Sequence, residues 1–195
     1  MNGFWLVSPY AAWILILSLC PATAGWYALR AFLTLALLAV ALYKGGGVSK
    51  LIPVSGWRGW LAALAVGLAI FAVWIAPEEL FGYGGAPISA ADSPYSPQNC
   101  GWSLTIIKLL GSALVISVAE ELFFRRWLVE FAGFWPMVVL FAVEHGDRWA
   151  VGAVTGVVYG LLAKRFGLGS STVAHALTNL VLGLWVIGRD AWRYW

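Results

Sequence analysis

Two adjacent glutamates at the end of a long apolar run constrain this chain more than any other feature. The run begins at Leu104 and is interrupted only by one lysine and a few small polar residues before Glu120 and Glu121. Ionisable groups inside a membrane span are costly and usually functional. In a helix, Glu121 and Arg125 form an i,i+4 pair with the acid before the base, which is the favourable order. Glu120 has Phe124 at that position instead, so the sequence predicts one neutralised carboxylate and one reactive carboxylate.

Composition indicates that lipid surrounds most of the chain. Hydrophobic residues make up 62% and charged residues 11% of the 195 positions, against about 45–50% and 25% in soluble domains. We therefore expect an all-α fold, a polytopic transmembrane helix bundle. No linker or repeat divides the chain, which predicts a single membrane domain over residues 1–195. The net charge of +3 comes from basic residues at span ends, so no nucleic-acid partner is needed to explain it.

The apolar runs predict about seven hydrophobic segments. Their approximate ranges are 4–20, 26–43, 59–76, 103–131, 135–145, 150–166 and 171–187. The first has no basic residue before it and is interpreted as a retained helix rather than a signal peptide. The fifth is shorter than the roughly 20 residues of a full span. It is therefore expected either to lie tilted and half-buried or to join the sixth segment through 146–148.

Loop charges predict the orientation of the bundle. The loop from Lys44 to Arg58 carries three positive charges and no negative one, which places it in the cytoplasm. The loop from Pro77 to Gly101 carries three acids and no base, which places it outside. Arg189 and Arg193 would then also lie outside, against the usual charge rule.

Both histidines of the chain stand in patterned positions. His145 closes the segment Phe141–His145, and His175 shares a helix face with Asn179 at i,i+4. A lone histidine in an apolar helix is usually a packing residue, but two of them beside an intramembrane glutamate pair indicate a site. A carboxylate can take a proton from water, and imidazoles can orient it or transfer protons. An amide with an imidazole can donate hydrogen bonds to a developing oxyanion.

Three motifs, taken in order, resemble those of the CPBP family of intramembrane proteases, which includes the CAAX endopeptidases. They lie on successive apolar segments and read Glu120-Glu121-x-x-x-Arg125, Phe141-x-x-x-His145 and His175-x-x-x-Asn179. The resemblance covers about 104–188, which gives a catalytic core of about 103–188. The segment from Glu144 to Trp149 and the tryptophan-rich C-terminus are similar to the bacterial branch linked to exosortase-type protein sorting.

The resemblance implies an intramembrane glutamic endopeptidase that needs no metal or other cofactor. Glu120 with His145 would activate water, and His175 with Asn179 would form the oxyanion hole. Glu121 and Arg125, supported by Phe141, would hold the shape of the site. Substrates would be membrane-anchored or C-terminally tagged peptides or proteins, and the location would be the bacterial inner membrane. The chain is shorter than the eukaryotic relatives, and nothing in it predicts a prenyl pocket.

Helix depth tests whether the motifs can meet. With a rise of 1.5 Å per residue, Glu120 lies roughly 5 Å and His175 about 6 Å from the inner edge of the membrane core. His145 lies about 15 Å along its segment from Trp135. It reaches the other two only if that segment starts below the interface or is bent by Pro136.

Two alternatives belong to other classes of protein. Glu120, His145 and His175 could hold a catalytic zinc ion, since two histidines and a carboxylate are a known ligand set, although the chain has no His-Glu-x-x-His. A non-catalytic immunity or scaffold protein could also have this fold.

Overall fold

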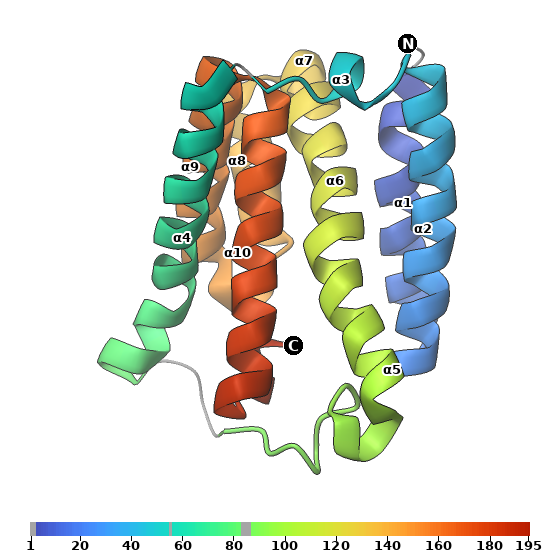
Figure 1. Cartoon of the computed structure of the whole chain (residues 1–195), viewed down its shortest axis with the longest axis vertical. Coiled ribbons are helices and arrows are strands. Elements are labelled where there is room, and N and C mark those ends of the chain that lie inside the picture. The colour runs from blue at the N-terminus through green and yellow to red at the C-terminus, as the bar shows by residue number, and fades with distance from the viewer. Residues whose placement is uncertain (1–2, 55, 83–86) are drawn as a thin grey trace.

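The fold is a bundle of helices that run roughly parallel to one long axis (Figure 1). The computed structural model describes residues 3–54, 56–82 and 87–195, and these ranges contain helices and no strand. The long elements are α1 (Gly3–Leu19), α2 (Ala24–Lys44), α4 (Gly56–Phe81), α8 (Phe134–Val143), α9 (Trp149–Phe166) and α10 (Leu168–Arg189). The short ones are α3 (Val48–Leu51) and the 3₁₀ turns η3 (Gly146–Arg148) and η4 (Trp192–Tyr194). The expected all-α membrane fold is confirmed.

One long helix, Pro97–Ala132, runs through the middle of the sequence. It consists of α5 (Pro97–Leu110), η1 (Gly111–Ile116), α6 (Ser117–Glu120), η2 (Glu121–Leu128) and α7 (Val129–Ala132). The η1 and η2 segments are π-helical, whereas the sequence predicted an ordinary α-helix. Such π segments are frequent at functional sites, and these two directly flank the turn that ends at Glu120.

Length and hydropathy identify the helices that can cross a membrane. Four qualify among the described residues: α2, α4, the 97–132 helix and α10. The helices α1 and α8 are apolar but shorter. Many large apolar side chains of these helices are exposed, including Phe32, Leu64 and Leu68. An exposed apolar surface of this extent would promote aggregation in water, and its natural solvent is lipid. The protein is an integral membrane protein.

Helix α10 holds the two halves of the bundle together. It packs against α4 and α9 on one side and against η1 and α6 of the long helix on the other, and α1 and α2 lie beyond the long helix (Figure 1). The contact with α4 is close because Gly67 has no side chain: a Cβ there would lie 2.9 Å from the backbone oxygen of Ala174. Thr178 also donates a hydrogen bond to the Gly67 carbonyl at 2.7 Å.

The fifth apolar segment does not span the bundle. Gly133, with φ of 95°, reverses the chain after α7, a conformation that favours glycine. The following helix, α8, has 10 residues, so it is about 15 Å long and ends part-way along the axis. It then joins α9 through η3, as in the second of the two alternatives derived from the sequence. This arrangement carries His145 into the interior of the bundle.

The loop that the sequence places outside begins later than the sequence indicated. Helix α4 continues through Pro77 to Phe81, so the expectation that Glu78 lies in a loop is wrong. Glu78 is buried, accepts a hydrogen bond from Arg148 and forms an ion pair with Arg193 at 2.5 Å. Burial alone would lower the pKa of the Arg193 guanidinium, but the nearby Glu78 carboxylate raises it above its ordinary value. The positive charge of Arg193 is therefore neutralised at the end of the bundle that the sequence places outside.

Candidate active site

Glu121 is completely buried, and two partners hold its carboxylate. Its Oε1 atom lies 3.2 Å from a guanidinium nitrogen of Arg125 and 3.0 Å from Nδ1 of His175. The Arg125 guanidinium is also stacked on the ring of Phe141, with its carbon 3.9 Å from the ring centroid. The ion pair predicted from the i,i+4 spacing is present, although η2 is π-helical there.

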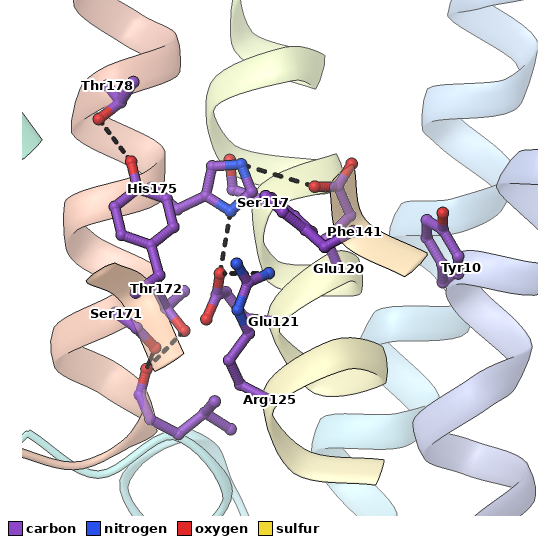
Figure 2. Close-up of polar contacts among 12 residues, drawn as sticks. Tyr10, Ser117, Glu120, Glu121, Arg125, Phe141, Ser171, Thr172, His175 and Thr178 are labelled. Carbon is purple, nitrogen blue, oxygen red and sulfur yellow. Dashed lines mark hydrogen bonds and ion pairs between the residues drawn. The ribbon is translucent and has the colours of Figure 1, made fainter. Parts of the chain in front are cut away.

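His175 lies between the two glutamates (Figure 2). While Nδ1 faces Glu121, Nε2 lies 3.6 Å from Oε2 of Glu120. His175 is 5% exposed, and its ring packs against the ring of Tyr159 with centroids 5.2 Å apart. Tyr159 is fixed in turn by donating a 2.6 Å hydrogen bond to Thr178. The imidazole is therefore held in position from two sides.

The two glutamates occupy different environments. Glu121 has an arginine partner, whereas among the described residues no lysine or arginine pairs with Glu120. Glu120 also lines a cavity of about 250 Å³, and Glu121 does not. The carboxylate that the sequence left without a basic partner is thus the one that faces open space.

The four predicted catalytic residues come together around this cavity. Glu120 of α6, His145 after α8, and His175 and Asn179 of α10 all line it. A larger cavity of about 820 Å³ lies near the loop after α2 and is lined by Lys50, Pro53 and Arg125 but by none of these four. The smaller cavity therefore contains the groups that could perform chemistry.

The backbone of α8 fixes the tautomer of His145. Its Nδ1 lies 2.6 Å from the carbonyl oxygen of Phe141. A carbonyl only accepts, so Nδ1 must carry the hydrogen, and the neutral ring keeps its lone pair on Nε2. His145 can therefore accept a proton or a hydrogen bond from a group in the cavity.

Asn179 uses its amide hydrogens within the protein. Its Nδ2 donates to the carbonyl of Ser112 at 3.0 Å and to the hydroxyl of Ser117 at 3.1 Å. These bonds tie α10 to the long helix at η1 and α6. An oxyanion in the cavity would have to replace one of these two acceptors to receive a hydrogen bond from the amide.

Two further residues at the site escaped the sequence analysis. Tyr10 of α1 donates a hydrogen bond to Glu144, whose carboxylate lies 3.8 Å from Nδ1 of His145. Figure 2 shows Tyr10 on the opposite side of Glu120 from His175. The sequence could have indicated Glu144 as a site residue, because it is an acid directly before His145. Tyr10 had none, because only the packing of α1 against η2 brings it there.

The zinc alternative lacks its ligand group. Among the described residues, no three His, Cys, Asp or Glu side chains are arranged so that they could share a metal ion. Glu120, His145 and His175 line one cavity without forming such a group.

The comparison with protein families is consistent with this geometry. The model of a family described as type II CAAX prenyl endopeptidase Rce1-like matches residues 102–181. This segment is similar to the Rce1-like endopeptidases. The match confirms the resemblance to the CPBP family, and it supports an intramembrane endopeptidase, a hydrolase that acts on membrane-anchored substrates in the bilayer. No curated protein and no solved structure matches the chain.

The Rce1-like segment contains all seven site residues predicted from the sequence, which are Glu120, Glu121, Arg125, Phe141, His145, His175 and Asn179. It does not contain α1 or α2, although Trp13 and Tyr27 of these helices line the cavity. The bacterial inner membrane and the exosortase-linked branch stay predictions.

Proposed function

We propose that this protein is a glutamic intramembrane endopeptidase in which Glu120 activates the water that attacks the peptide bond. The observation that carries the proposal is the inequality of the two glutamates. Glu121 is held by Arg125 and His175, while Glu120 faces the cavity and, among the described residues, pairs with His175 and with no arginine or lysine. A general base needs a free lone pair within reach of its water, and Glu120 is the carboxylate with that freedom.

The reaction requires two proton movements. Glu120 takes one proton from water as the water oxygen bonds to the carbonyl carbon of the substrate. The proton then passes to the amide nitrogen as the carbon–nitrogen bond breaks, which releases an amine and a carboxylic acid that then loses its own proton to water. His145, with its Nε2 lone pair, is suited to accept a hydrogen bond from the same water.

The developing oxyanion needs hydrogen-bond donors beside the bond that is cleaved. When His175 is protonated, its Nε2–H lies on the Glu120 side and can donate. Asn179 is four residues further along the same face of α10 and lines the same wall. Glu121 and Arg125 keep the imidazole in place while the charge develops.

The test is a comparison of membrane-protein termini in cells that carry either the wild-type chain or Glu120→Gln. We expect a set of new termini that require the wild-type chain and disappear with the variant. Glu130→Gln is the matched control, because Glu130 forms an exposed pair with Arg126 away from the cavity. Unchanged cleavage by Glu120→Gln would refute the proposal.

A further inference from the structure

Two basic side chains line the catalytic cavity on its outer side. Arg30 of α2 and Lys108 of α5 border the same space as Glu120. Arg30 lies about 9 Å along α2 from its outer end. Lys108 lies about 18 Å along the long helix from Glu120, toward the outer end. Both positions are within the helices that can cross the membrane.

Neither cation has an acidic partner. All nine Asp and Glu residues lie in the ranges that the structure describes, and none forms an ion pair with Arg30 or Lys108. Arg30 is only 7% exposed, and its Nε atom has no hydrogen-bond partner. Buried charges are normally paired, so this part of the cavity lacks an anion.

Aromatic rings hold the two cations without neutralising them. The Arg30 guanidinium lies 4.2 Å from the ring centroid of Trp13 and 5.1 Å from that of Tyr27. The Lys108 ammonium lies 4.4 Å from the same Tyr27 ring and donates to Ser112 at 3.3 Å. Rings attract cations but carry no net charge, and two cations around one ring repel each other. An anion bound between them would remove this repulsion.

The usual fate of a basic side chain in a membrane helix does not explain this pair. Lysine and arginine near helix ends commonly extend their charged heads to the lipid headgroups. Here Lys108 is turned toward Ser112 and the Tyr27 ring inside the bundle, and Arg30 is buried on the cavity wall. Both charges face the space where substrate would bind.

We propose that Arg30 and Lys108 form a subsite for a carboxylate of the peptide substrate, on the outer side of the bond that is cleaved. This inference rests on the proposed function and adds a substrate class to it. An extended peptide covers about 3.3 Å per residue. Lys108 and Glu120 are about 18 Å apart along the same helix. The carboxylate therefore lies within about five residues of the cleaved bond. It is either the C-terminal carboxylate or an acidic side chain.

The test measures peptide binding rather than cleavage. The full-length Glu120→Gln protein, in nanodiscs of neutral lipid, is titrated with two N-palmitoylated heptapeptides of alanine and leucine. One ends in a free carboxylate and the other in a carboxamide. We expect the free acid to bind at least about tenfold more tightly, since charge-assisted hydrogen bonds are the strong ones. The double variant Arg30→Gln/Lys108→Met should lose this preference. Equal binding of the two peptides overturns the proposal, as does a preference that persists in the double variant.

Control variants separate charge from folding. Arg30→Lys with Lys108→Arg keeps both positive charges and should keep most of the preference. Arg58→Gln removes an exposed cation at the start of α4, outside the cavity, and should leave the preference unchanged. If the preference disappears in Arg58→Gln as well, general electrostatic attraction explains it and the subsite is refuted.

Further ligands identify the source of the anion. A carboxamide peptide with aspartate as its last residue should bind like the free acid if a side-chain carboxylate is sufficient, and like the plain amide if the C-terminus is required. Either result assigns the carboxylate. If phosphatidylglycerol in the nanodisc abolishes the preference for the free acid, lipid phosphate occupies the subsite and the proposal fails.

The binding result is independent of the peptidase proposal. If Glu120→Gln stops cleavage in cells but the peptides bind equally, only the carboxylate subsite is overturned. If the free acid is preferred but Glu120→Gln cleaves normally, the subsite stands and the glutamate mechanism is overturned.

Discussion

At the level of single residues, Glu120 and Glu121 show how adjacent identical side chains acquire different roles. Glu121→Gln leaves the buried Arg125 guanidinium without its carboxylate, and removing one partner of a buried pair costs about 3–5 kcal/mol. Glu120→Gln breaks no arginine pair. We therefore expect Glu121→Gln to lower the melting temperature in detergent clearly, while Glu120→Gln melts near the wild-type temperature and loses peptidase activity. The opposite pattern, a destabilised but active Glu120→Gln protein, would assign the base to Glu121.

The oxyanion donors give a second prediction at this level. His175→Ala and Asn179→Ala should each lower turnover by roughly 10²–10³-fold, as for a typical donor loss, with the protein still folded in detergent. Turnover of a membrane-anchored substrate, measured beside the melting temperature, checks both points. Normal turnover in both variants would mean that the pair only packs, and that the bonds of Asn179 to Ser112 and Ser117 are its whole role.

At the level of elements, the contact between α4 and α10 controls the position of His175. Gly67→Ala places a methyl group against the backbone next to His175, and overpacking of this kind costs typically about 1–3 kcal/mol. We expect a lower melting temperature and reduced activity. Gly188→Ala is the control on α10, because nothing lies within 4 Å of a Cβ at Gly188. Equal melting temperatures for the two variants would show that the helices separate freely at Gly67.

The helices that the sequence predicts well are those defined by long apolar runs, such as α2 and α10. The π-helical segments η1 and η2 were not predicted, because apolar periodicity cannot distinguish a π turn from an α turn over six to eight residues. The C-terminal end of α4, at Phe81 rather than near residue 76, was not predicted for a different reason. Glu78 is acidic and stands beside a proline, which suggests a loop, but its partners Arg148 and Arg193 come from distant parts of the chain.

The site shows the same division between local and distant information. Glu121 with Arg125 and His175 with Asn179 are each separated by one helical turn, so the sequence could pair them. Arg30 and Tyr10 come from helices far from the motifs, and only tertiary packing reveals that they border or approach the site.

At the level of the whole molecule, the chemistry of the site predicts how the protein responds to chelators. If carboxylate and imidazole alone activate water, purified protein should contain less than one equivalent of zinc and stay active through prolonged chelation. Metal analysis beside a cleavage assay measures both quantities. Bound zinc whose removal abolishes activity, and whose return restores it, would contradict the glutamate mechanism.

The cavity is assembled from two parts of the chain. The Rce1-like segment supplies Glu120, both histidines and Asn179, while Trp13, Tyr27 and Arg30 of the N-terminal hairpin supply part of the wall. The four residues proposed for catalysis lie in one segment, whereas Arg30, one half of the proposed carboxylate subsite, lies in the N-terminal hairpin. A chimaera that keeps residues 45–195 of this chain, which include α4, and takes its first two helices from another such protease should keep the catalytic residues in place. It should lose the preference for a carboxylate wherever the new second helix has no basic residue at the position of Arg30.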